Sequence, residues 1–221
     1  MNQTSRFSMG SDIDDFNHDG RPDIVTVDML PDDNERQKLM NAGSNNDLFN
    51  LSLNNGYLPQ YSRNMLQLNN GTDSKGQVSF SEIGQLAGID KTDWSWSALF
   101  ADLDNDGLKD LFITNGIPKD ITNIDLVAYW EQSTQGNYNY AAVKRGFQEK
   151  VNRLKAVDKP NVVYANMGNL TFADKSEAWG LNKKGFSNGA VYADLDNDGD
   201  LDLVTNNINE QASVFINHSE L

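Results

Sequence analysis

The chain contains no cysteine, which excludes disulfide bonds, thiolate zinc sites, iron–sulfur clusters and cysteine nucleophiles. It has only two histidines, and no apolar run approaches the roughly 18 residues that a membrane-spanning helix needs. Basic residues are also few, because 18 Lys and Arg accompany 32 Asp and Glu, for a net charge of −14. A field of that sign repels phosphates and anionic lipids, so we expect neither nucleic-acid binding nor direct membrane insertion.

An acidic nine-residue motif occurs three times in the 221 residues. The sequence DLDNDGLKD at 102–110 returns as DLDNDGDLD at 194–202, and DFNHDGRPD stands at 15–23. The similarity extends beyond the motif, because Phe80 and Gly88 have counterparts in Phe172 and Gly180 at the same spacing of 92 residues that separates the last two motifs. Self-similarity at a fixed period indicates a repeated structural unit.

A complete repeat consists of four short runs of strand character joined by turns, and the acidic motif joins the first run to the second; the third repeat has three such runs. Four short strands with tight turns make one blade of a β-propeller. The sequence therefore predicts a mainly β chain that forms a partial propeller of nearly three four-stranded blades. We expect blade one at 7–88, blade two at 89–180 and a partial blade three at 181–221. Propellers usually close with about four to eight blades, so we also expect the remaining blades of a longer parent chain as partners.

The first two repeats carry long insertions between their second and third strands, at 30–60 and 117–159. Residues that favour helix N-termini and apolar residues at helical spacing predict helices from Asp32 or Asp33 to Met40, over 47–53, over 124–132 and over 138–156. Because successive strands run in opposite directions, both insertions should lie on the propeller face opposite the acidic loops.

The acidic motif has the composition of a site for a hard cation. Side-chain oxygens at positions 1, 3, 5 and 9, a backbone carbonyl at position 7 and a glycine at position 6 form an all-oxygen set suited to calcium rather than to zinc or magnesium. Eleven of the 32 acidic residues stand at positions 1, 3, 5 and 9. We expect two or three calcium ions, with the first loop weakest because Asn17 replaces a carboxylate. The candidate ligands are Asp15, Asn17, Asp19, Arg21 and Asp23; Asp102, Asp104, Asp106, Leu108 and Asp110; and Asp194, Asp196, Asp198, Asp200 and Asp202.

Two other interpretations of the motif are weaker. An EF-hand needs a bidentate Glu at position 12 and a helix on each side, whereas position 12 here is Thr26, Ile113 or Thr205 inside a predicted strand. A run of Asp, Asn and Gly can also form a simple hairpin turn. Three copies at the same place in a repeat favour the metal site over the turn.

The acidic loops with their flanking strands resemble the FG-GAP/VCBS repeats of integrin-alpha-like β-propellers. The segments NMLQLNNG at 64–71 and FSEIGQLAG at 80–88 are similar to the ASPIC-type subgroup of bacterial VCBS-repeat proteins. The resemblance implies calcium in the loops, a parent propeller of about seven blades and an extracytoplasmic location in the cell envelope, at the cell surface, in the periplasm or secreted. The first copy departs from the pattern, because Asp12 and Asp14 stand in a strand that is usually apolar.

We expect the chain to act as a module that binds a glycan or a protein. The alternative is part of a polysaccharide-degrading enzyme, a lyase or a glycosidase. Neither histidine is placed as a catalytic base, and no nucleophile-elbow motif is present, so we assign no catalytic residue. The second insertion is basic, which indicates either an anionic ligand or a solvated helix face. The candidate contact residues are Tyr129, Trp130, Lys144, Arg145 and Arg153.

Overall fold

The computed structural model describes residues 1–40, 46–135 and 139–219. The first sheet has the strand order β2-β3-β5-β6, and every neighbouring pair in it is antiparallel. Its strands are β2 (Gly10–Asp14), β3 (Asp23–Val27), β5 (Met65–Thr72) and β6 (Val78–Glu82).

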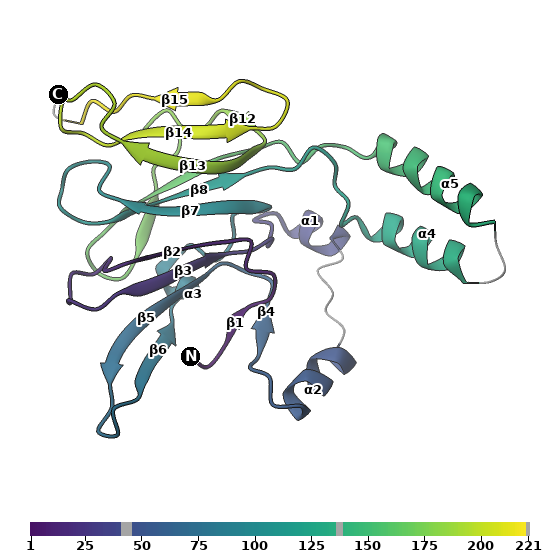
Figure 1. Cartoon of the computed structure of the whole chain (residues 1–221), viewed down its shortest axis with the longest axis horizontal. Helices are drawn as coiled ribbons and strands as arrows, with labels where there is room; N and C mark the ends of the chain where they lie inside the picture. The colour runs from purple at the N-terminus through teal and green to yellow at the C-terminus, as the bar shows by residue number, and fades with distance from the viewer. Residues whose placement is uncertain (41–45, 136–138, 220–221) are drawn as a thin grey trace.

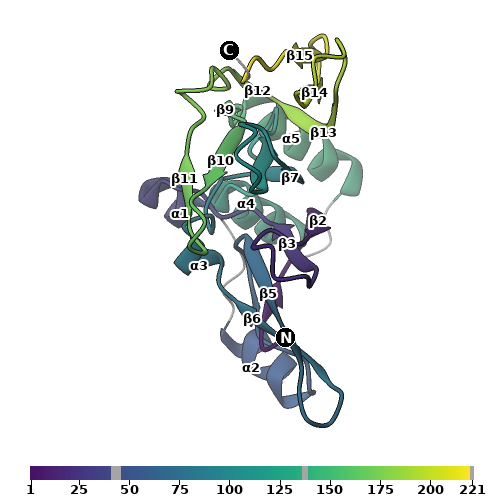
Figure 2. The same cartoon turned by 90° about the vertical axis from the view of Figure 1, so that its left-hand side faces the viewer.

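The second and third sheets repeat this meander (Figures 1 and 2). The second sheet contains β7 (Ser95–Ala101), β8 (Asp110–Asn115), β10 (Val162–Asn166) and β11 (Phe172–Asp174). The third contains β13 (Ser187–Ala193), β14 (Asp202–Asn207) and β15 (Ser213–Phe215). The prediction of nearly three four-stranded blades is confirmed, and from here the three sheets are called blades one, two and three.

The blades stack through their first strands, with β7 in contact with β2 on one side and β13 on the other (Figure 1). Gly10 in β2 allows the closest approach, because a Cβ atom there would lie 2.2 Å from the carbonyl oxygen of Trp96. Asp12 also links the two strands, since its carboxylate accepts a hydrogen bond of 2.7 Å from the backbone nitrogen of Phe100. The acidic residue that departs from the repeat pattern thus joins blade one to blade two.

The hydrophobic core lies between the blades, as expected for sheets that pack face to face. Between blades one and two, Phe16 packs against Phe100 and Phe172, with ring centroids 6.1 and 5.7 Å apart. A second cluster between blades two and three includes Phe112 and Val163. Each interface therefore has its own apolar core.

Equivalent residues show that the outer face of blade three is uncovered. Val25 and Leu66 are paired in blade one and fully buried, and their counterparts Phe112 and Val163 are fully buried in blade two. Val214, the counterpart of Leu66 and Val163 in blade three, is 55% exposed. The same register position is thus core in two blades and surface in the third.

The insertions are helical, as predicted, and lie on the side opposite the acidic loops (Figure 1). The first contributes α1 (Asn34–Leu39) and α2 (Asn46–Asn54), and the second contributes α4 (Ile124–Thr134) and α5 (Tyr140–Arg153). Asp33 caps α1 by accepting from the backbone nitrogen of Arg36, and Asn123 caps α4. Residues 41–45 of the predicted insertion, and residue 138 of the predicted helix over 138–156, lie outside the described residues. No helix in the described part of the chain has the length and apolar character to cross a bilayer.

The two insertions meet over a small apolar cluster and a charged one. Met40 of the first insertion packs with Ile117 and Val157 of the second. Above this cluster the guanidinium of Arg36 donates to Asp93 at 2.8 Å and to Asp120 at 2.5 Å. Both insertions are therefore anchored to blade two and to each other.

Two short strand pairs and one short helix lie outside the blade pattern. β1 (Thr4–Ser5) pairs in parallel with β4 (Gln60–Tyr61), and β9 (Lys159–Pro160) pairs with β12 (Lys184–Gly185). A single turn of helix, α3 (Gly84–Ala87), follows blade one. The sequence did not predict them, because two-residue strands and a one-turn helix are too short to show a period.

Candidate metal centre

The three acidic loops share one backbone shape. The residue at position 4 adopts a left-handed conformation in each, with φ of 58° at His18, 58° at Asn105 and 64° at Asn197. The glycine at position 6 has a positive φ in all three loops, which a residue with a Cβ atom rarely adopts. The carboxylate at position 1 accepts a hydrogen bond from that glycine, for example Asp102 from Gly107 at 3.0 Å. The motif therefore folds as a tight loop with its first carboxylate turned inward.

The acidic residue at position 9 begins the second strand and is buried. In blade two Asp110 is 1% exposed and accepts from the backbone nitrogens of Leu103 at 3.0 Å and Asn166 at 2.9 Å. Asp202 makes the same pair of contacts, with Leu195 and Asn217. This carboxylate thus fixes the loop to the end of the third strand.

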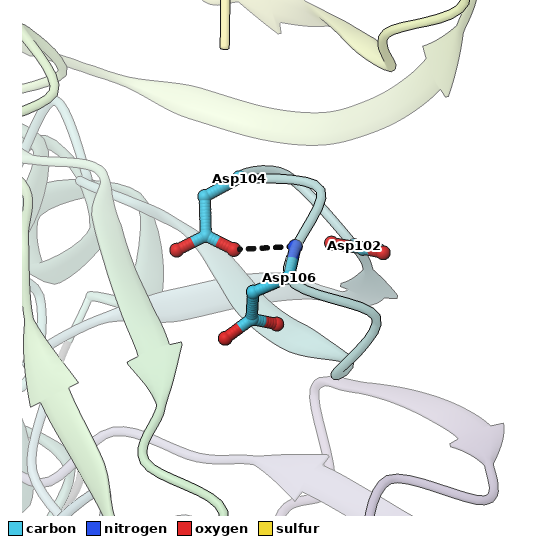
Figure 3. A group of neighbouring side chains, drawn as sticks. All are labelled: Asp102, Asp104 and Asp106. Atoms are coloured by element: carbon cyan, nitrogen blue, oxygen red, sulfur yellow. Dashed lines mark hydrogen bonds between the residues drawn. The ribbon is translucent and has the colours of Figure 1, made fainter. Parts of the chain in front are cut away.

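The second loop brings three carboxylates together. Asp102, Asp104 and Asp106 each offer an oxygen atom within 4.8 Å of the others. Figure 3 shows these side chains around the turn, where the carboxylate of Asp104 accepts from the backbone nitrogen of Asp106 at 3.3 Å. Burial and then the charges of Asp106 and Asp102 raise the pKa of Asp104. A cation in the cluster would relieve this repulsion.

The third loop gathers a slightly different set. Asp194, Asp196 and Asp202 lie within 4.8 Å of one another, and of these Asp202 is buried. Asp198 is not one of these three, although it accepts from the backbone nitrogen of Asp200 at 3.0 Å, as Asp106 does from that of Leu108 at 2.8 Å. Both loops thus provide three clustered carboxylates, although the third is Asp106 in one loop and Asp202 in the other.

The first loop contains a positively charged side chain, that of Arg21. The guanidinium of Arg21 donates to the carboxylate of Asp19 and, at 2.9 Å, to the carbonyl oxygen of Asn69. The amide of Asn17 also donates to Asp19 at 3.2 Å. Arg21 was predicted as a backbone-carbonyl ligand, and its side chain is the feature that the motif did not reveal.

Two buried carboxylate oxygens in these loops have no hydrogen-bond partner among the described residues, namely Oδ2 of Asp23 and Oδ1 of Asp102. Asp23 is completely buried. Burial, aided by the charges of Asp19 and Asp15, raises the pKa of Asp23 to about 6, and burial raises the pKa of Asp110 to about 6. Unpaired buried oxygens are costly unless a cation or a proton satisfies them. The donor set of the loops therefore fits an oxygen-liganded divalent cation.

The predicted contact residues lie on the helical hairpin of α4 and α5. Lys144, Arg145 and Arg153 are exposed on α5. Trp130 packs edge-on against Phe147 with centroids 4.7 Å apart, and Tyr129 lies under the ammonium of Lys150. The hairpin itself therefore uses part of the surface of both aromatic rings.

Sequence reasoning missed a set of asparagines that connect neighbouring blades. The amide of Asn166 donates to the carbonyl oxygen of Phe16 at 2.9 Å, and that of Asn217 donates to the carbonyl oxygen of Leu103 at 2.7 Å. Asn105 likewise donates to Asp200 of the next loop. Asn166 and Asn217 stand at the same point of two repeats, which was a visible signal, but their partners across the interface were not visible in the sequence.

Comparison with known proteins agrees with this architecture. A search of curated proteins finds no significant match. A family model for the FG-GAP-like repeat matches residues 15–113 and 154–205. The matched residues include all three acidic loops and exclude both α4 and α5. Because the match covers more than half of the sequence, the chain belongs to the FG-GAP-like repeat family.

Proposed function

We propose that the chain is a calcium-stabilised sector of an extracytoplasmic β-propeller that binds a glycan or a protein. Its acidic loops hold two or three calcium ions, and its insertions supply the recognition surface. We further propose that it is of the ASPIC type, as the segments at 64–71 and 80–88 indicate. The FG-GAP-like repeats of the chain support its role as a propeller sector, and they are also the starting point for the ASPIC-type proposal.

The observation that supports calcium best is the unpaired Oδ1 of Asp102 beside the carboxylates of Asp104 and Asp106. A simple β-hairpin turn, the alternative interpretation of the motif, does not require the three carboxylates to lie close together. A hard cation with flexible coordination would use all three oxygens and also relieve their mutual repulsion.

Isothermal titration of chelator-treated protein with calcium tests the metal role. We expect at least two sites, and a melting temperature that rises with calcium. At 100 times the dissociation constant, one site adds about 2.7 kcal/mol of stability. Magnesium and zinc at the same concentrations serve as matched controls. A melting temperature that calcium and chelator leave unchanged would contradict the proposal.

Recognition is assigned to the hairpin because extra chain in repeat proteins gathers on one face, often the binding face. Lys144, Arg145 and Arg153 give the hairpin of α4 and α5 a basic surface in a chain of net charge −14. A glycan array probed with the chain and with an Arg145→Glu, Arg153→Glu variant tests the assignment. Binding that the charge reversal leaves intact would place recognition elsewhere, and release of sugars would favour the enzyme alternative.

The uncovered face of blade three supports the proposed partnership with further blades. Val191, Val204 and Val214 form one row across the sheet, and their counterparts in blade two pack against blade three. A following blade would bury this row in the same way.

A further inference from the structure

A cavity of about 340 Å³ opens at one end of the interface between blades two and three. It adjoins β15, which pairs only with β14 among the described residues. Its walls are mainly apolar, and they include Leu103, Trp179, Leu181, Leu203, Phe215 and Asn217.

The interface between blades one and two shows what fills the space that corresponds to this cavity. Leu103 corresponds to Phe16, and Leu181 corresponds to Ile89 in the repeat. Phe16 and Ile89 are fully buried in a cluster that also contains Phe172 of β11. β11 is the fourth strand of blade two, and Phe172 lies opposite Asn166 on β10. A fourth strand with an aromatic ring therefore fills the space that is a cavity beside blade three.

The edge of β15 resembles the edge of β10 with which β11 pairs. The backbone nitrogen of Asn217 donates to Asp202 at 2.8 Å, as that of Asn166 donates to Asp110 at 2.9 Å. Asn217 also donates through its amide across the interface to Leu103, as Asn166 does to Phe16. The end of β15 thus has the anchoring that β10 has where β11 pairs with it.

We propose that β15 and this cavity bind an extended peptide strand, antiparallel to β15, whose aromatic side chain stands opposite Asn217 and enters the cavity. Main-chain hydrogen bonds to the strand edge supply affinity, and the cavity selects the aromatic residue. The inference rests on the proposed role of the chain as an incomplete propeller sector, but it does not depend on calcium. The occupant has the chemistry of β11, with a Thr-Phe pair after a turn.

A synthetic peptide with the sequence of residues 166–176, NMGNLTFADKS, is the probe. Titrated into the 221-residue protein in a calorimeter, it should bind at one site, both with calcium and with chelator. Replacing its Phe by Ala should weaken binding about tenfold or more, because the apolar ring surface is lost. A peptide methylated on the amides that face β15 should not bind. Absence of binding, or equal binding of the Phe and Ala peptides, would overturn the proposal.

A photo-crosslinking arm locates the bound peptide. With benzoylphenylalanine in place of Phe, we expect crosslinks to Trp179, Leu181 or Phe215. Crosslinks to Phe16 or Phe100 would show that the peptide replaces β11 instead, which contradicts the proposal.

Dimers that the peptide dissociates would identify a second copy of the chain as the occupant, and displacement of the peptide by a glycan would identify a sugar site. Either result would also overturn it. The calcium titration is a separate measurement, so the two proposals fail independently.

Discussion

Arg21 and Asp19 form an ion pair inside the first acidic loop, where the other two loops gather carboxylates alone. The residues that correspond to Arg21 are Leu108 and Asp200, neither of which can supply a positive charge. The guanidinium of Arg21 therefore neutralises the carboxylate of Asp19, which we propose as a calcium ligand. It also binds the carbonyl oxygen of Asn69, which connects the loop to β5.

Replacing Arg21 by Leu, the residue at this position in the second loop, should strengthen calcium binding at the first loop. The substitution frees the carboxylate of Asp19 and removes a competing cation. Calorimetry should show a tighter first site, while the melting temperature in chelator falls because Asp19 loses its partner. Arg21→Lys, which keeps the charge, is the matched control. Unchanged calcium affinity in Arg21→Leu would show that the ion pair does not compete with the metal.

Asp106→Ala and Asp196→Ala should each lower the stability of the calcium-loaded protein by about 1–3 kcal/mol, and Asp19→Ala should lower it less. The first two remove a member of a three-carboxylate cluster, whereas Asp19 is already satisfied by Arg21. Chemical denaturation in excess calcium and in chelator measures the difference. Equal losses in all three variants would mean that the first loop binds calcium as well as the others.

Calcium stabilisation should weaken as the pH falls from about 7 to about 5. Burial raises the pKa of Asp23 and Asp110 from 3.8 to about 6. In the metal-free protein the folded state therefore binds these protons more readily than the unfolded state. This contribution increases stability as the pH falls through about 6 toward about 4. Calcium needs the ionised carboxylates, so the same protons compete with it. Melting temperatures at pH 7, 6 and 5, with calcium and with chelator, should converge, and a constant difference would contradict the prediction.

The blade strands could be predicted because the repeat itself supplies the comparison. A strand in one copy supports the strand at the same place in the next, and the acidic motif fixes the register through the buried Asp23, Asp110 and Asp202. Helix starts were equally visible, since Asp33 and Asn123 use their side chains as caps. These are local signals, and a single sequence contains them.

The contacts between elements could not be predicted in the same way. The motif predicted that the backbone of Arg21 stands at position 7 of the loop. It did not predict that the guanidinium turns back to the carboxylate of Asp19, because the spacing of residues says nothing about where a long side chain points. Trp130 was predicted as a contact residue for a partner, and its packing edge-on against Phe147 of α5 could not be predicted from the sequence. The cavity beside β15 follows only from comparing two interfaces in three dimensions.

Arg36→Met should destabilise the protein by about 3 kcal/mol, because it removes the closest positive charge from the buried carboxylate of Asp93. Among the described residues, that carboxylate would keep a hydrogen bond from the backbone nitrogen of Trp94 and a more distant charge, Lys159 at 3.8 Å. Asp93 is 1% exposed, so solvent cannot replace the guanidinium. Lys183→Met is the matched control, because Lys183 and Glu210 form an exposed pair whose loss should cost little. Urea denaturation of both variants provides the comparison. Similar small effects would show that the Arg36 cluster does not anchor the insertions.

Removing the hairpin should leave the acidic loops intact, because α4 and α5 lie at the other end of the blades (Figure 1). The structure gives the place for the cut. The backbone nitrogen of Asp120 donates to the carbonyl oxygen of Lys155 at 3.1 Å, so a short Gly-Ser bridge can replace 121–153. The deletion keeps Asp120 for Arg36 and Val157 for the apolar cluster. We expect unchanged calcium stoichiometry, a small fall in melting temperature and loss of glycan or protein binding. Lost calcium binding would contradict the separation of the two ends, and retained partner binding would contradict the role of the hairpin.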